Sequence, residues 1–347
     1  GADVLQRVAV MCTDGITRTV NVDKSLNYPA GWMVRIDVTP EGENVTAIEN
    51  RTISGTVSAD ATMLGDHKLA DDVQILDTTT EGVAGTVRPS RLSGTKLNML
   101  NVRYYTLNDN GEIDRMILND VTGDLWKYGV LDDIRNIAAN LPSTKTPATA
   151  GDSEGEGSDG TTQVLKDLRS VLVPTTSEIL WGVINGDILQ TVWNKVTSST
   201  GSLVSIGVKQ LAKVVGEPYG TILNYVGGGA TYVCYVNGQL TSYTTSIKYP
   251  VLAGGLAVRQ EVNGSVKAMI QLMPMKIDKV GAASVLSGST RYEVADNAQV
   301  YLWYKGQYYA TKLAEVNSDD YYLTGWYDNF GCAAGKRVRV IVAVKKD

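Results

Sequence analysis

Leu-Ala-Asp-Asp-Val-Gln-Ile (residues 69–75) and Val-Ala-Asp-Asn-Ala-Gln-Val (residues 294–300) are two copies of one pattern in a chain of 347 residues. Further matches precede both stretches in the same order: residues 10–15 with 232–238, Tyr28-Pro29 with Tyr249-Pro250, Val34-Arg35 with Val258-Arg259, and 44–47 with 265–268. Matches that keep one order at nearly constant spacing indicate an internal duplication. We therefore expect two units of one fold, in which the corresponding residues are Tyr28 and Tyr249, Arg35 and Arg259, and Ala70 and Ala295.

Both units alternate short runs rich in Val, Ile, Thr and Tyr with Asp-Gly, Asn-Gly or Gly-Ser turns. Such runs, bounded by such turns, are typical of strands joined in hairpins. The sequence therefore predicts two related small antiparallel β-barrel or β-sandwich units. The first is expected over residues 1–122, and the second over residues 123–131 plus 230–347.

Between the units, apolar residues recur at intervals of three and four, which is typical of amphipathic helices. We expect one helix over residues 132–141 and others within 164–226, including one that begins at Glu178. Residues 132–229 are thus predicted to form a helical insertion, so the fold class is mainly β with an α insertion. Residues 143–160 combine Pro, Gly and acidic residues without an apolar anchor, and we expect a mobile acidic linker there.

Charge and hydropathy exclude several classes of partner. The formal net charge is −5 and the isoelectric point is near 5.1, so no basic face for nucleic acid is predicted. No run of about eighteen apolar residues occurs, and the N-terminus lacks the pattern of a signal peptide, so no membrane span is expected.

The three cysteines are too few to hold the fold together by disulfides, and no pair of them has the spacing of a zinc site. Cys12 and Cys234 are expected at equivalent buried strand positions, and Cys332 in a turn without a neighbouring base that would make it reactive. No cofactor is predicted.

His67 is the sole histidine, which removes most acid–base, triad and metal designs. The adjacent pairs Asp71-Asp72 and Asp319-Asp320 point to opposite sides of an extended chain, which does not suit a glycosidase pair. The sequence therefore predicts no enzyme and no catalytic residue, and a hydrolase that uses carboxylates alone is the third-ranked alternative.

The acidic segment carries two apparent motifs. Residues 155–160 match the Gly-x-Gly-x-x-Gly dinucleotide pattern, but no strand precedes them and their acidic side chains would repel a pyrophosphate. Asp152, Glu154 and Glu156 resemble the first ligands of a calcium loop, although Gln163 stands where the bidentate carboxylate belongs. They form a weak calcium candidate, with solvated surface charge as the alternative.

Tyrosine and tryptophan are concentrated near the C-terminal end of the chain. Tyr301, Trp303, Tyr308 and Tyr309 are the candidate binding residues, for a glycan or for a protein. Cross-strand aromatic pairs also stabilise an exposed sheet without any ligand, and this alternative stays open.

The C-terminal unit carries a family resemblance. Four stretches in it, residues 295–302, 308–309, 322–328 and 335–343, together with residues 57–123 of the first unit, resemble the C-terminal repeat region of S-layer-homology-type (SLH domain-containing) surface proteins of Gram-positive Firmicutes. The resemblance implies an extracellular, cell-surface location, with anchoring modules elsewhere in such proteins, and it supplies no catalytic residues.

Together these observations favour a non-catalytic structural, spacer and interaction region of an S-layer-like, adhesion-type surface protein. Cell-wall polysaccharide or neighbouring surface proteins are the expected partners. A glycan-binding module that uses the Tyr/Trp strip is the alternative function.

Overall fold

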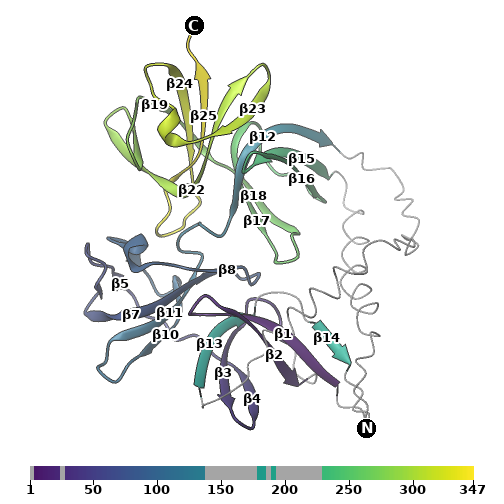
Figure 1. The fold of residues 1–347 in the computed structure, drawn as a ribbon, viewed down its shortest axis with the longest axis vertical. Coiled ribbons are helices and arrows are strands. Elements are labelled where there is room, and N and C mark those ends of the chain that lie inside the picture. The colour runs from purple at the N-terminus through teal and green to yellow at the C-terminus, as the bar shows by residue number, and fades with distance from the viewer. Residues whose placement is uncertain (1–3, 24–27, 137–177, 185–188, 193–228) are drawn as a thin grey trace. The chain divides into compact units, whose positions relative to one another are not determined.

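The computed structural model describes residues 4–23, 28–136, 178–184, 189–192 and 229–347. The chain divides into two compact units, residues 1–119 with 141–225 and residues 120–140 with 226–347. Each unit contains two main β-sheets (Figure 1). The mainly β class predicted from the sequence is therefore confirmed, and the described residues hold no α-helix, only the short 3₁₀ helices η1 and η2.

The elements of the first unit are β1 (Val4–Cys12), β2 (Thr17–Asp23), β3 (Met33–Thr39), β4 (Gly42–Ala47), β5 (Gly55–Thr56), β6 (Met63–Leu64), β7 (His67–Thr78), β8 (Ala84–Thr86), η1 (Pro89–Leu92), β9 (Lys96–Leu97), β10 (Val102–Leu107), β11 (Ile113–Asn119), β13 (Glu178–Ile184) and β14 (Leu189–Val192). One sheet has the order β14-β1-β13-β3-β4, with β2 also paired to β1. The other has the order β10-β11-β7-β6, with β8 paired to β7, and β5 pairs with β9 separately.

The elements of the second unit are β12 (Lys127–Asn136), β15 (Ala230–Val236), β16 (Gln239–Thr245), β17 (Gly254–Gln260), β18 (Val266–Gln271), β19 (Met273–Ile277), β20 (Lys279–Val280), β21 (Ser284–Ser287), β22 (Thr290–Tyr304), β23 (Gln307–Thr311), η2 (Leu313–Glu315), β24 (Tyr321–Tyr327) and β25 (Val338–Lys345). One sheet has the order β16-β15-β12-β17-β18. The other has the order β19-β24-β25-β22-β21-β20, with β23 paired to β22.

The first sheets of the two units share one plan. A central strand, β13 or β12, lies between two hairpins, β1-β2 and β3-β4 in one unit and β15-β16 and β17-β18 in the other. The central strand precedes its hairpins along the chain in the second unit but follows them in the first. The two units therefore reach the same sheet by different routes along the chain.

The second sheets share a register as well as an order. β7 pairs in parallel with β11 from Leu69 opposite Ile113 and, after an irregularity, from Gln74 opposite Arg115. β22 pairs in parallel with β25 from Val294 and, after the same kind of irregularity, from Gln299. The matched stretches, residues 69–75 and 294–300, therefore form the same bulge in both units. These two pairs are parallel, a departure from the antiparallel sheets predicted, because a long connection separates β7 from β11 and β22 from β25.

One tyrosine hydrogen bond occurs in both units. The hydroxyl of Tyr28 donates to the carbonyl of Val45 on β4 at 3.1 Å, and that of Tyr249 donates to the carbonyl of Lys267 on β18 at 3.2 Å. Each matched tyrosine therefore ties the loop between the two hairpins to the second hairpin of its sheet.

The matched glutamines recur in the same way. Gln74 Oε1 accepts from Thr13 Oγ1 at 2.8 Å, and Gln299 Oε1 accepts from the Asn237 N–H at 2.8 Å. Thr13 and Asn237 lie in the turns of the first hairpins, so each glutamine ties its second sheet to the same part of the first.

Parts of the predicted helical insertion are strands. Residues 132–136 continue β12, and residues 178–184 and 189–192 form β13 and β14. The helix predicted from Glu178 is wrong. Leu180 and Ile184 of β13 are buried on one face and Val183 on the other, and apolar residues at such intervals in a short strand cannot be told from a helix by periodicity alone. The remainder of the predicted insertion, including the linker 143–160, lies outside the described residues.

The two buried cysteines are offset by two positions rather than equivalent. Cys12 lies opposite Gly182 on β13, whereas Cys234 lies opposite Leu131 on β12, two residues beyond Gly129. Cys12 is the last residue of β1, whereas Tyr235 and Val236 follow Cys234 in β15. Both side chains nevertheless belong to the core of their own sheet.

Candidate functional site

Tyr301, the first predicted contact residue, lies between the two sheets of the second unit and is fully buried. Its hydroxyl donates to Gln299 Oε1 at 2.5 Å and accepts the Gly238 N–H at 3.2 Å. Burial raises the pKa of the Tyr301 phenol. The ring therefore joins the sheets and offers no surface for stacking a ligand.

Three aromatic side chains continue outward from Tyr301 along one face of the second sheet. Trp303 on β22 lies opposite Tyr308 on β23 and opposite Val344 on β25, which in turn lies opposite Tyr322 on β24. Residues opposite each other on paired strands share a face, and adjacent strands lie about 4.8 Å apart. We call Tyr308, Trp303 and Tyr322 the aromatic row.

The aromatic row is open to solvent at Trp303 (42% exposed) and Tyr322 (64% exposed). Tyr308 is half-buried and packs on Tyr235 with ring centroids 5.4 Å apart. The Lys346 ammonium lies 5.3 Å from the centroid of the Tyr322 ring. Flat, half-exposed rings with a polar tip can stack on a sugar ring or on a partner's apolar side chain.

Tyr309, the fourth predicted residue, lies on the opposite face of the same hairpin. It is paired with Leu302, is 47% exposed, and donates its hydroxyl to Gln307 Oε1 at 2.9 Å. Tyr322 was absent from the predicted contact residues. Its position in β24 was the available signal, since alternation in that strand turns Tyr322 away from the buried Leu323.

The residues considered for catalysis are exposed within their own units. His67 is exposed at the start of β7, and Asp71 and Asp72 are exposed in the bulge that follows. Asp319 and Asp320 are exposed in the turn before β24. Asp152, Glu154 and Glu156 lie outside the described residues. Within the part of the chain that the structure describes, no three His, Cys, Asp or Glu side chains gather in a way that could hold a metal ion.

The fully buried Arg339 on β25 lies at the centre of a charged network in the second unit. Its guanidinium contacts Asp328 and Asp124, each at 2.6 Å, Asn297 Oδ1 at 3.0 Å, and the carbonyl of Thr122 at 2.8 Å. A buried charge needs such partners to offset its desolvation. The network ties the segment that leads into β12 to the second sheet.

Tyr128 extends this network. The Arg339 guanidinium lies 4.7 Å from the Tyr128 ring centroid, and the Tyr128 hydroxyl donates to the carbonyl of Gly123 at 2.6 Å. Burial raises the pKa of Tyr128 well above its usual range. The neutral phenol is therefore the hydrogen-bond donor to Gly123 in the fold.

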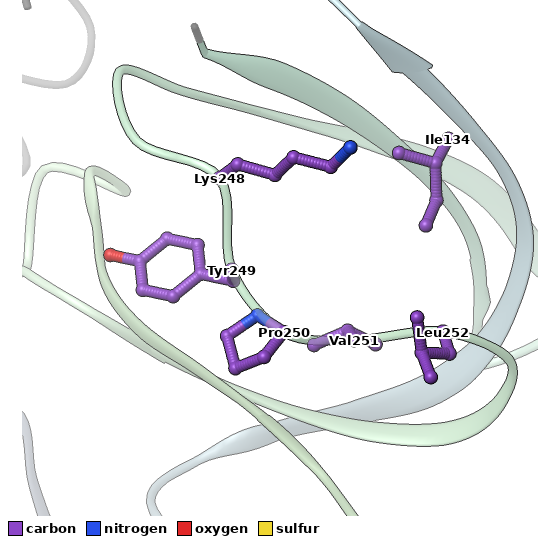
Figure 2. Close-up of a pocket in the computed structure, with 6 residues that line it drawn as sticks. All are labelled: Ile134, Lys248, Tyr249, Pro250, Val251 and Leu252. Atoms are coloured by element: carbon purple, nitrogen blue, oxygen red, sulfur yellow. The ribbon is translucent and has the colours of Figure 1, made fainter.

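A hollow of 410 Å³ lies at one end of the first sheet of the second unit (Figure 2). Ile134 of β12 and residues 248–252 line it, with Lys248 as the only charged residue among these and with Leu252 85% exposed. Among these described lining residues, a single ammonium group stands on an otherwise apolar surface, whereas several converging polar groups are needed to orient a small substrate.

No protein-family model, curated protein or solved structure matches the chain. Among the described residues, no helix has the length and apolar character needed to cross a membrane. The residues of the two units are therefore the basis for any functional conclusion.

Proposed function

We propose that this chain is a non-catalytic structural and interaction region of an S-layer-like cell-surface protein, built from two related β-sandwich units. The supporting observation is that both units contain the same four internal features: the central strand, the bulge, the tyrosine hydrogen bond and the glutamine hydrogen bond. Each of these joins one part of a unit to another. Contacts that hold a unit together require no chemistry, and a second unit of the same fold adds length to the chain. The surface location rests on the resemblance to SLH-type proteins.

The experiment that tests the structural role is incubation of the purified chain with cell-wall polysaccharides, followed by measurement of released reducing sugar. We expect no release. Release that disappears when one carboxylate is replaced would overturn the structural role in favour of a carboxylate-only hydrolase.

The aromatic row supports glycan binding as a second candidate function. A glycan array tests it with the wild type, Trp303→Ala and Tyr322→Ala. Tyr309→Ala is the matched control, because Tyr309 is similarly exposed but lies on the opposite face of the hairpin. Binding that is lost in the first two variants and kept in the control would establish the row as the site. An array without binding leaves the row as a stabilising feature of the sheet.

A further inference from the structure

The central strand of the first unit fills a slot between two hairpins. β13 pairs on one side with β1, where Cys12 lies opposite Gly182, and on the other with β3, where Val34 lies opposite the same glycine. β1 and β3 thus each present a pairing edge to β13. Strand edges of this kind bind any extended segment of matching pattern.

The slot recognises both faces of the strand that enters it. Leu180 and Ile184 belong to the core enclosed by the first sheet, whereas Val183 packs between the sheets with Met33 and Ile117. Gly182 lies between these positions, where a Cβ atom would come within 2.5 Å of the Met11 carbonyl oxygen. The slot therefore selects an aliphatic residue, a glycine and two more aliphatic residues at fixed positions.

The central strand of the second unit carries the glycine and the two aliphatic residues after it, whereas the exposed Lys127 stands at the position of Leu180. Tyr128-Gly129-Val130-Leu131 on β12 corresponds to Trp181-Gly182-Val183-Ile184 on β13, since in each the aromatic residue and the valine face one side and the last residue faces the other. A Cβ on Gly129 would likewise meet a carbonyl oxygen, that of Tyr235, at 2.5 Å. The glycine and the two aliphatic residues that follow it are thus the part of the pattern that both central strands share.

No short turn joins β13 to either of its neighbours. β1 and β3 end before residue 40, whereas β13 begins at residue 178, after residues 137–177, and residues 193–229 follow β14. Short turns normally dictate which strand enters which slot. Here the contacts are the same whether β13 comes from the same chain or from a second copy, so the choice depends on effective concentration.

We propose that the strand Glu178–Ile184 is exchanged between copies of this chain, so that the slot of one copy is filled by the strand of the next. This inference rests on the proposed structural role and supplies its means of assembly. The partner is a second copy because the slot already holds this chain's own segment, and every copy carries that segment. Crowding of copies on a surface raises the effective concentration of the strand from a neighbour and favours exchange.

A disulfide between copies tests the exchange. Ile179 and Asp37 are Cα partners in the pairing of β13 with β3. Ile179 is 39% exposed and Asp37 is half-buried in an ion pair with Arg35 at 2.7 Å, so neither substitution removes a side chain of the apolar core. Cross-strand partners have Cα separations of about 4.5–5.5 Å, within the range for a disulfide. With Cys332→Ser as background, Ile179→Cys chains and Asp37→Cys chains are co-refolded at high concentration, oxidised and separated on a non-reducing gel.

We expect a band of twice the monomer mass from this mixture and none when Asp37→Ser chains replace the Asp37→Cys chains. The double variant Ile179→Cys with Asp37→Cys must form its bridge within a monomer at low concentration, which shows that the pair can be bridged. A bridged double variant with no dimer from the mixture would overturn the exchange. That result would leave the structural role intact, because the sugar-release assay tests that role separately.

Discussion

Gly129 and Gly182 occupy the same position in the two central strands, and replacing each by alanine gives a paired test of the fold. A Cβ on Gly182 would lie 2.5 Å from the Met11 carbonyl oxygen and 2.6 Å from Val10 Cγ1. A Cβ on Gly129 would lie 2.5 Å from the Tyr235 carbonyl oxygen. These neighbours are ladder backbone or packed side chains, so the strands themselves must separate to admit the methyl group.

The cost of such overpacking is about 1–3 kcal/mol in a well-packed core. For units of this size, 1 kcal/mol corresponds to a fall of about 2–4 °C in Tm, so each variant is expected to lose roughly 2–12 °C. Because the units have separate cores, Gly182→Ala should lower only the transition of the first unit and Gly129→Ala only that of the second.

Calorimetry measures both transitions, and hydrogen exchange assigns each one to its unit. Each variant is the control for the other, since the chemical change is identical. Unchanged melting of both variants would show that the central strands are not packed as described. Loss of both transitions in either variant would show that the units do not unfold separately.

Other substitutions and labelling test the buried groups. Arg339→Met should lower the free energy of unfolding, measured in urea, by about 3–5 kcal/mol because it leaves the buried Asp328 without its cation, and a loss below 1 kcal/mol would contradict that role. Burial raises the pKa of Cys234 to about 12, so a thiol reagent at pH 8 should label Cys332 in the native protein and Cys234 only after unfolding. Tyr28→Phe removes a hydroxyl that donates to β4 and should cost about 0.5–1.5 kcal/mol in the unfolding of the first unit, while an unchanged midpoint would show that water replaces the bond.

The duplication was predictable from sequence because the matched residues make the same packing contacts in both units. Tyr28 and Tyr249 make the same bond, and the stretches that contain Gln74 and Gln299 form the same bulge. A self-comparison detects such positions directly. The parallel pairing of the strands that carry the bulges was not predictable, since the alternation of apolar residues does not encode the direction of a neighbour.

The strand β13 shows why part of the insertion was mistaken for helix. Leu180 and Ile184 face one core and Val183 the other, so the apolar residues lie at intervals of three and four although the strand is extended. Gly182 was the contrary signal, because glycine is unfavourable inside a helix. Its match with Gly129 becomes visible only once the two sheets are compared.

The candidate contact surface was predicted in part. Trp303 and Tyr308 lie in the aromatic row. The burial of Tyr301 depends on the turn at Gly238, which is remote in sequence from the ring. Tyr322 enters the row only through the pairing of β24 with β25. The alternation within one strand predicts which face of the sheet a side chain lies on. Whether that side chain is exposed depends on the elements that pack against the face.

The position of β13 along the chain has a consequence for synthesis on the ribosome. β1 to β11 of the first unit emerge first, but the slot stays empty until residues 178–184 have followed. At about 5–20 residues per second, that interval after residue 119 lasts roughly 3–13 s. During it, β12 of the second unit is already made while the hairpins that flank it are not, so a nascent chain carries one slot without a strand and one strand without a slot.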